Sequence, residues 1–438
     1  MKLILVLFFL SVPFFNAFTQ KIAREKLDRL ISYIEANNQG VGAVSVFSEG
    51  KEVYHRSFGQ HAINNLKFNA HSKYQVGSIT KVFTAVLIWK LIESGKLSLA
   101  DKLSAFYPQI PNAEKISIRN LLEHSSGIRR DYGHKSGNKK WLLDSLVKDQ
   151  EIIDEITRQG VEFEPGDSVA YSNSGFYLLK NIAEQRYGQS YGKLINKHII
   201  KPTGLKDLAS ADMTPGNLFS SYAYNYAENT WMQKTDYLYR NIIGVGDIAT
   251  TPSQVNKFLH QLFQGKILRR ETVLQMLPAG EEEFGRNLTA VNIYKKVLYG
   301  HAGDTKGSHS LAVYDTANNI AIAICINGER YPYNNFYADI LRTIYTEQDN
   351  LPYFASAQEI KEYAGTYTDK TSGLQLRIYL DEQYGLLCED VREEVSFPLS
   401  PYAFNQVRFD LLGIRIEFRT NDLTLFQNGT NTILKKQQ

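Results

Sequence analysis

The chain has 438 residues, with 49 Lys and Arg against 46 Asp and Glu and a formal net charge of +3. A chain of this length exceeds one ordinary hydrophobic core, so we expect more than one domain. The small net charge, with no arginine-rich run or basic stripe, argues against nucleic acid as a partner. The nine His residues form no metal-ligand motif, and no glycine-rich loop fits a phosphate or dinucleotide. We therefore expect no metal and no cofactor.

The N-terminus predicts export. Met1-Lys2 precedes the apolar run LILVLFFLSVPFF (residues 3–15), which Pro13 interrupts and which is short for a membrane span. Small and polar residues follow, so residues 1–19 are predicted to be a signal peptide, cleaved after Thr19, that sends the protein to the periplasm or the medium. An uncleaved anchor is the alternative. No later segment is apolar enough to span a membrane, so we expect no integral span after cleavage.

Periodicity along the chain predicts an α+β domain over residues 20–346. Residues 41–59 alternate about Glu49-Gly50 as a β-hairpin, and residues 78–94 are apolar on all sides, as in a buried helix. Polar loops with helical pieces follow to about residue 280. Residues 309–328 predict two strands joined at 316–319, and a helix follows at 334–345. We expect one antiparallel sheet, shared by both ends of the domain and flanked by helices, plus an all-α cluster.

The C-terminal part has a different periodicity. Residues 347–362 are predicted to be a linker. Residues 363–438 alternate with period two, for example at Leu374, Leu376, Ile378 and Leu380, which predicts a separate all-β unit, a barrel or sandwich. The only two cysteines, Cys325 and Cys388, fall in different predicted domains, and we expect two buried thiols rather than a disulfide.

The pattern Ser-x-x-Lys marks a candidate nucleophile and base, but it is not specific. Of its occurrences, only Ser78/Lys81 opens a wholly apolar helix. A helix N-terminus stabilises negative charge, Lys81 at i+3 faces the serine, and a desolvated lysine can act as a base. The N–H of Ser78 could also supply half of an oxyanion hole. The pattern occurs at Ser48/Lys51, Ser78/Lys81, Ser136/Lys139, Ser145/Lys148 and Ser190/Lys193.

Two further short motifs carry groups suited to acyl transfer. Tyr171-Ser-Asn173 precedes an apolar helix: the phenol could relay a proton and the amide could hold a carbonyl, or the stretch could simply cap the helix. His301-Ala-Gly303 enters a strand, where Gly303 lets a substrate backbone approach the sheet edge. The N–H of Asp304 would then be the second oxyanion donor. Taken alone, His301 could equally be a structural histidine at a strand edge.

The three motifs together resemble the serine β-lactamase and penicillin-binding-protein superfamily. The His-x-Gly form is similar to the branch of class C β-lactamases, DD-peptidases, D-aminopeptidases and related esterases. The resemblance covers residues 25–345, and the tail from EYAGTYTD resembles a small β-barrel domain appended to some members. The stretches that carry it are ISIRNLLEHSSGI (116–128), FEPGDSVAYSNSGFYLL (163–179), GVGDIATTPSQVNKF (244–258) and YGHAGDTKG (299–307).

The resemblance implies a role for each motif residue, and it leaves the choice of base between Lys81 and Tyr171 open. His124, Ser125 and Ser126 fall in a family stretch that we interpret as structural. The implied roles are nucleophile for Ser78, base for Lys81, proton transfer for Tyr171, substrate carbonyl or amide binding for Asn173, support of Tyr171 and of the cleft charge for His301, close substrate approach for Gly303, and oxyanion donation for the N–H groups of Ser78 and Asp304.

Two departures from the family pattern shape the functional prediction. His301-Ala302 stands where β-lactamases have Lys followed by a hydroxyl residue, and such a pair suits a carboxylate less well. Asp304 adds a carboxylate near the expected oxyanion hole, unless it points to the other face; Lys306 could offset it. We therefore predict an exported serine hydrolase acting on a small-molecule ester, peptide or amide. The alternatives are a β-lactamase and a penicillin-binding sensor without turnover. The sequence does not determine the oligomeric state.

Overall fold

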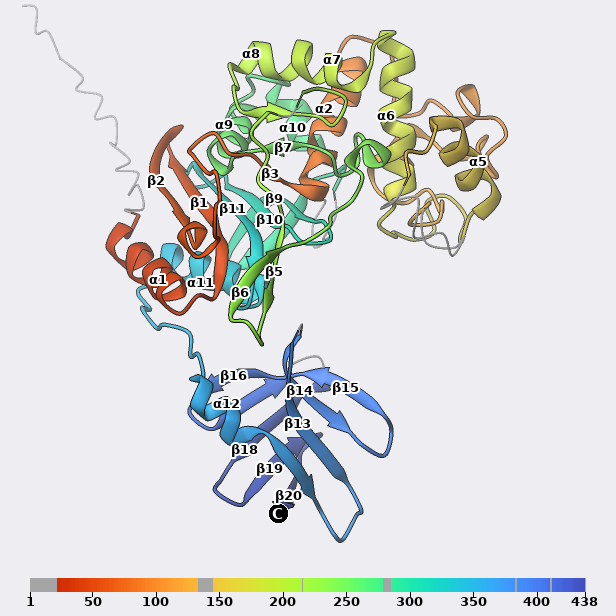
Figure 1. Cartoon of the computed structure of the whole chain (residues 1–438). Coiled ribbons are helices and arrows are strands. Elements are labelled where there is room, and N and C mark those ends of the chain that lie inside the picture. Colours follow the sequence, from red (N-terminus) through yellow and green to blue (C-terminus); the bar gives the residue numbers. More distant parts are fainter. Residues whose placement is uncertain are drawn as a thin grey trace, which may run out of the picture.

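The computed structural model describes residues 22–132, 145–214, 216–278, 285–382, 384–409 and 412–437. An α+β unit is followed by an all-β unit (Figure 1), as the sequence predicted. The predicted signal peptide, residues 1–19, and the pair Ser136/Lys139 lie outside the described residues. In the part of the chain that the structure describes, no helix has the length and apolar character needed to cross a membrane.

The α+β unit is built on an antiparallel sheet with the strand order β2-β1-β11-β10-β9-β8. Two more strands, β5 and β6, form a hairpin that meets the end of β11 through one parallel pair. The strands are β1 (Gly40–Ser48), β2 (Lys51–Phe58), β5 (Tyr222–Asn225), β6 (Thr230–Gln233), β8 (Thr289–Ile293), β9 (Lys296–Asp304), β10 (His309–Asp315) and β11 (Ile320–Glu329).

The predicted hairpins of the sheet are confirmed. Glu49 and Gly50 have φ of 52° and 74°, the left-handed geometry of a two-residue turn between β1 and β2. The turn 316–319 joins β10 to β11. β1 pairs along its length with β11, from Gly40 opposite Glu329 to Ser48 opposite Ile320. The first and last strands of the domain therefore lie side by side, as expected.

Helices cover both faces of the sheet, because alternate residues of the strands are apolar on each side. α1 (Arg24–Ala36) and α11 (Tyr333–Tyr345) pack on one face in a single hydrophobic cluster. α2 (Thr80–Glu93) and α9 (Pro252–Phe263) belong to the larger cluster on the other face. The predicted helix 334–345 corresponds to α11. The chain thus has a layered core with the sheet between two sets of helices.

The remaining helices form the expected helical cluster beside α2 (Figure 1). A short three-stranded sheet, in the order β3-β7-β4, connects this cluster to the start of α2. The elements are α3 (Ile118–Leu122), α5 (Asp149–Gln159), α6 (Asn173–Tyr187), α7 (Tyr191–Ile195), α8 (Lys201–Thr203), α10 (Arg270–Met276), β3 (Tyr74–Gln75), β4 (Leu208–Ala209) and β7 (Ala249–Thr250).

The all-β unit is a curled, barrel-like sheet of nine antiparallel strands in the order β15-β14-β13-β12-β20-β19-β18-β17-β16. The helix α12 (Ala357–Tyr363) precedes it, within the stretch predicted as a linker; the domain boundaries stay predictions. Cys325 and Cys388 are both buried and free, as expected. The strands are β12 (Gly365–Thr368), β13 (Gln375–Asp381), β14 (Gly385–Asp390), β15 (Val395–Pro398), β16 (Ser400–Ala403), β17 (Gln406–Phe409), β18 (Ile414–Phe418), β19 (Asp422–Gln427) and β20 (Thr430–Lys436).

Candidate active site

Ser78 lies in a short 3-10 turn, η2 (Gly77–Ile79), that leads directly into α2. We expected the α-helix to begin at Ser78, and the structure starts it two residues later. Gly77 has a φ of 51° and lies against the backbone of Asp304, so the chain turns tightly before the helix begins. Between residues 74 and 89, Ser78 is the one residue that is not buried. The packing of α2 therefore presents a single hydroxyl at the surface of the core.

Lys81 forms a hydrogen bond with the hydroxyl of Ser78. Its Nζ donates to Ser78 Oγ at 2.9 Å and to the carbonyl of Val245 at 2.9 Å. The side chain is fully buried, and this burial lowers the pKa of the ammonium to about 7, with Arg130 adding to the shift and Asp131 opposing it. Lys81 has no salt bridge among the described residues. A substantial fraction of this lysine is therefore neutral near pH 7 and able to accept a proton from the serine.

The loop 244–248 supplies the carbonyl that orients Lys81. Thr84, one turn further along α2, donates to the carbonyl of Gly244 at 2.6 Å. Asp247 is buried and closes the loop, accepting from the N–H of Gly244 at 2.8 Å and from the N–H of Ala211 at 2.9 Å. The loop 244–248, which we call the shelf loop, thus orients the lysine through a backbone carbonyl. The sequence GVGDIATT does not reveal this role.

Tyr171 lies over the same two residues. Its ring centroid is 4.9 Å from Lys81 Nζ. Burial raises the pKa of the phenol, and the hydrogen bond with Ser78 offsets part of that rise. The phenol therefore stays protonated at neutral pH. Since the neutral form of Lys81 is the more accessible base, Tyr171 is better suited to donate a proton than to remove one from Ser78.

His124, which we interpreted as structural, packs directly against Tyr171. The two rings lie 4.6 Å apart between centroids, and His124 Nδ1 accepts from the N–H of Ser172 at 3.1 Å. Its carbonyl accepts from the N–H of Ala170 at 2.9 Å. Burial, with Lys81 and His301 nearby, holds the pKa of His124 well below its usual range. The imidazole and the backbone carbonyl of His124 thus hold the residues on either side of Tyr171.

His301 approaches Tyr171 from β9, with 6.2 Å between the ring centroids. Its Nδ1 contacts the carbonyl of Ala302, which can only accept, so Nδ1 carries the proton and Nε2 is the acceptor. Burial and the nearby Lys81 lower the pKa of His301 to about 4. At neutral pH His301 therefore offers a lone pair near the site and no positive charge.

Gly303 makes a close backbone crossing between β9 and η2. A Cβ at this position would lie 2.0 Å from the carbonyl oxygen of Val76 and 2.8 Å from the nitrogen of Ser78. In the same way, a Cβ on Gly77 would lie 2.7 Å from the nitrogen of Asp304. The two candidate oxyanion donors, the N–H groups of Ser78 and Asp304, thus lie on adjacent segments at this crossing.

The carboxylate of Asp304 points away from this crossing. Residues 301 and 303 are buried, and residues 302 and 304 are exposed, as expected for alternate faces of a strand. Asp304 Oδ1 lies 2.7 Å from His309 Nδ1. The sequence offered Lys306 as one group that could offset this charge, and the partner that the structure shows is His309. The orientation removes the conflict between the carboxylate and an oxyanion hole.

Asn173 opens α6 at the other side of the site. Its N–H donates to the carbonyl of Arg130 at 2.8 Å, and its amide donates to Asp131 Oδ2 at 3.5 Å. Arg130 also lies 5.6 Å from the ring centroid of Tyr171. Arg130 and Asp131 were not predicted, and only their place directly after the stretch 116–128 could have suggested them. Arg130 and Asp131 thus add a cation beside Tyr171 and a carboxylate beside Asn173.

The other Ser-x-x-Lys pairs have no comparable contact. Among the described pairs, no hydrogen bond joins the serine to its lysine except at Ser78/Lys81. Ser48 and Lys51 flank the β1–β2 turn, and Ser190 precedes the short helix α7. Within the described residues, no group of three His, Cys, Asp or Glu side chains is arranged to hold a metal ion.

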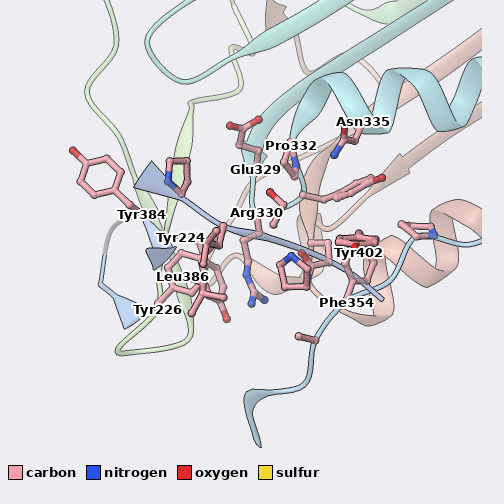
Figure 2. A pocket seen from close by; sticks show the side chains of 18 of the residues that line it. Tyr224, Tyr226, Glu329, Arg330, Pro332, Asn335, Phe354, Tyr384, Leu386 and Tyr402 are labelled. Atoms are coloured by element: carbon pink, nitrogen blue, oxygen red, sulfur yellow. The ribbon is translucent and has the colours of Figure 1, made fainter. Parts of the chain in front are cut away.

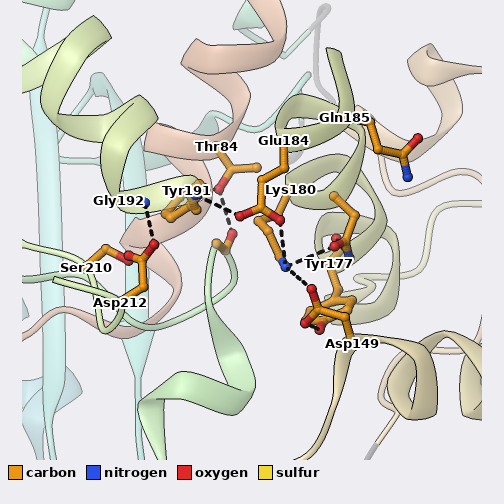
Figure 3. A network of polar contacts seen from close by, with 12 residues as sticks. Thr84, Asp149, Tyr177, Lys180, Glu184, Gln185, Tyr191, Gly192, Ser210 and Asp212 are labelled. Carbon is orange, nitrogen blue, oxygen red and sulfur yellow. Dashed lines mark hydrogen bonds and ion pairs between the residues drawn. The ribbon is translucent and has the colours of Figure 1, made fainter. Parts of the chain in front are cut away.

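A polar network behind the site fixes α6 against α2 (Figure 3). Lys180 is buried and lies 3.2 Å from Glu184 and 3.5 Å from Asp149. Glu184 accepts from the N–H of Tyr191 at 2.7 Å, and the hydroxyl of Tyr191 contacts that of Thr84 at 2.8 Å. These contacts link Lys180 to the helix that carries Lys81 and, through Thr84, to the shelf loop.

Comparison with known proteins shows the family of the chain. A family model described as Beta-lactamase matches residues 27–344. PbpX of Bacillus subtilis, which is named as a penicillin-binding protein, is 30% identical over 251 residues, 55% of this chain and 59% of its own length. Teichoic acid D-alanine hydrolase of Staphylococcus aureus is 25% identical over 247 residues, 56% of this chain and 58% of its own length. The chain thus spans less than two thirds of the curated relatives it matches.

Solved structures show the same fold. D-amino acid amidase from Ochrobactrum anthropi SV3 aligns with a TM-score of 0.65 at 23% identity, over 73% of this chain and 97% of that one. The octameric penicillin-binding protein homologue from Pyrococcus abyssi aligns with a TM-score of 0.70 at 21% identity, over 94% of this chain and 99% of that one. At this coverage the second alignment includes most of the all-β unit.

Proposed function

Since the chain belongs to the β-lactamase family, we propose that it is a serine hydrolase that works through an acyl-enzyme on Ser78. The observation that carries the proposal is the hydrogen bond of 2.9 Å between Ser78 Oγ and a fully buried Lys81. A nucleophile within reach of a base with a lowered pKa is the arrangement that acyl transfer requires. Neither residue would be expected in this environment for packing alone.

In the proposed reaction, neutral Lys81 accepts the hydroxyl proton as Ser78 Oγ attacks the substrate carbonyl carbon. The carbonyl oxygen becomes an oxyanion that accepts from the N–H groups of Ser78 and Asp304. When the tetrahedral intermediate collapses, the bond to the leaving oxygen or nitrogen breaks, and Tyr171 passes a proton to that atom. Tyr171 is then replenished from the protonated Lys81. Water hydrolyses the resulting serine ester and restores the hydroxyl.

The substrate is proposed to be an ester or a small amide or peptide, including D-amino-acid derivatives. Two relatives support this class by name: a D-amino acid amidase and a teichoic acid D-alanine hydrolase. His301 is neutral at neutral pH, because burial and Lys81 lower its pKa to about 4. It therefore offers no cation to the carboxylate of a penicillin, which favours an esterase or amidase over a β-lactamase. We also propose export, on the N-terminal sequence alone.

The test is a stopped-flow assay with a short-chain p-nitrophenyl ester, read together with intact mass. The wild type should show a burst, turnover and a transient acyl adduct, and Ser78→Ala should lose all three. Ser190→Ala is the matched control, because it alters the exposed serine of another Ser-x-x-Lys pair. Fast nitrocefin hydrolysis would instead indicate a β-lactamase, and an adduct that never clears would indicate a sensor.

A further inference from the structure

A cavity of about 730 Å³ lies between the α+β unit and the all-β unit. One wall comes from β5 and from the segment that joins β11 to α11, and the other comes from β13, β14, β16 and β17. The N–H of Tyr226 donates to the carbonyl of Glu382 at 3.0 Å, so the two walls are joined directly. Cavities of this size at domain interfaces commonly hold small ligands.

One end of the cavity lies close to the proposed oxyanion hole. Lys306, Gly307 and His309 line it, and they belong to the turn that follows Asp304. His309 contacts the carboxylate of Asp304 at 2.7 Å, on the face of the sheet opposite His301. A ligand in the cavity would therefore lie just beyond the strand that carries the second oxyanion donor.

The charges around the cavity favour an anion. Five Lys and Arg side chains line it against two acids, whereas the whole chain is nearly balanced at 49 to 46. Arg342 is paired with Asp339 at 2.9 Å. Among the described residues, Lys234 and Lys306 have no hydrogen bond or salt bridge from their ammonium groups. These two cations stand at the end nearest Asp304, where they can meet a carboxylate or phosphate group.

Aromatic side chains are prominent in the rest of the lining (Figure 2). Arg330 lies 4.2 Å from the ring centroid of Tyr224 and 5.2 Å from that of Tyr226, which holds these rings in place. Tyr384 is 65% exposed at the rim, although a large aromatic side chain is usually covered. Tyrosine rings can pack flat against the C–H face of a sugar while the hydroxyl group binds its polar edge. The lining contains seven Tyr and one Phe.

We propose that this cavity binds an anionic saccharide, a sugar chain with carboxylate or phosphate groups, that carries the group cleaved at Ser78. The cations bind the charged groups and the tyrosines stack on the sugar rings. This inference rests on the proposed function for its link to catalysis, but the binding itself does not require turnover. Binding energy from such a remote part of a substrate would help to hold the reacting carbonyl at the serine.

The binding test uses the full chain carrying Ser78→Ala, titrated calorimetrically with four probes. Two are anionic saccharides, a hyaluronan hexasaccharide with carboxylates and a mannopentaose phosphate; chitohexaose is the neutral control and hexaglutamate the non-sugar anion. At least one anionic saccharide should bind tenfold more tightly than both controls, and the preferred one identifies the charged group. No saturable binding, or equal binding of hexaglutamate, would overturn the proposal.

Matched variants locate the site. Tyr384→Ala should weaken saccharide binding about tenfold, whereas Phe404→Ala, an equally exposed aromatic side chain of the same unit at 66% exposure, should change it less than twofold. Lys306→Gln should weaken binding similarly, and Lys295→Gln, outside the cavity, should not. Equal effects of the two members of either pair would refute the location. Binding without any acyl-enzyme in the wild type would refute the hydrolase and leave the cavity site intact.

Discussion

Lys81 and Lys180 are both buried lysines, but their surroundings differ. Lys180 has the carboxylates of Glu184 and Asp149 within 3.5 Å, so its charge is compensated. Among the described residues, Lys81 makes hydrogen bonds only to the hydroxyl of Ser78 and the carbonyl of Val245. Because no carboxylate forms a salt bridge with it there, burial is the largest influence on its protonation, with Asp131 and Arg130 acting in opposite directions. The same residue type is thus held in a salt-bridge network on α6 and is the proposed base on α2.

The pH dependence of acylation follows from Lys81. Its pKa is lowered to about 7 by burial, and the base is the neutral form. We expect kcat/KM for a non-ionising ester to rise with pH, with a midpoint near 7, and then to reach a plateau. His301, with a pKa of about 4, and His124 stay neutral over this range and add no second step. Steady-state kinetics from pH 5 to 9 test this. A midpoint near the usual lysine value would contradict it.

The same burial predicts an unusual stability effect for Lys81→Met. The pKa of Lys81 is lower in the folded chain than in the unfolded chain, so the unfolded chain binds more protons between the two values. The stability of the wild type should therefore fall as pH falls from 9 to 6, by roughly 2 kcal/mol from this group. Lys81→Met should be inactive, and its gain in stability over the wild type should be larger at pH 6. Denaturant unfolding at both pH values measures this. A gain that is equal at both pH values, or larger at pH 9, would contradict it.

Gly303→Ala tests the oxyanion crossing. The added Cβ would meet the Val76 carbonyl at 2.0 Å, so β9 must move away from η2 and separate the two donors. We expect kcat/KM to fall roughly 100-fold or more, since each donor contributes on that scale. Ala302→Ser, on the exposed face of the same strand, is the control and should retain activity. Wild-type rates for Gly303→Ala would refute the assignment of the donors.

At the scale of elements, the apolar periodicity of the sequence predicted the helices and strands whose own residues show which sides are buried. The helix 78–94 was recognisable because it is apolar on every side, and the β1–β2 hairpin because Glu49-Gly50 separates two alternating runs. Residue Leu380 shows the limit: its strand alternates as predicted, yet it is 45% exposed at the rim of the interdomain cavity. The exposure of such a residue depends on how separate elements pack, and no local sequence pattern encodes that packing.

The shelf loop 244–248 is the element whose role the sequence did not reveal. Its effect on Lys81 depends on hydrogen bonds between residues more than 150 positions apart, such as that between Lys81 and Val245. The pairing of Asp304 with His309 and the position of Arg130 beside Tyr171 span fewer positions, but they too join separate elements. The sequence predicted the motif residues, whereas their orientation became clear only when the elements were placed in space.

Asp247→Asn tests the shelf. An amide cannot accept with both atoms, so one of the bonds to Gly244, Ala211 or Ser210 is lost and the loop loosens. We expect about tenfold lower kcat/KM, a shifted pH midpoint and about 1–3 kcal/mol lower stability. Asp212→Asn is the control, because its remaining amide oxygen can still accept from the N–H of Gly192, away from Lys81, and it should not move the midpoint. The same midpoint shift in both variants would contradict a positioning role for Asp247.

At the scale of the whole molecule, two units share one boundary. The α+β unit carries the proposed catalytic residues, and the all-β unit closes one side of the interdomain cavity. The alignment with the Pyrococcus abyssi protein covers 94% of this chain, so the all-β unit is part of a fold that also occurs elsewhere. The order of the units was predictable from the change of periodicity near residue 363. The cavity between them was not, because it depends on their docking.

The proposed mechanism requires that Ser78 is acylated, and peptide mapping of the trapped intermediate measures this. The protein would be quenched in acid during the burst with a p-nitrophenyl ester, digested and analysed by mass spectrometry. We predict the acyl mass on the peptide that contains Ser78, with fragment ions that place it on that residue. Acylation of another residue, or turnover with no covalent adduct on Ser78, would contradict the account.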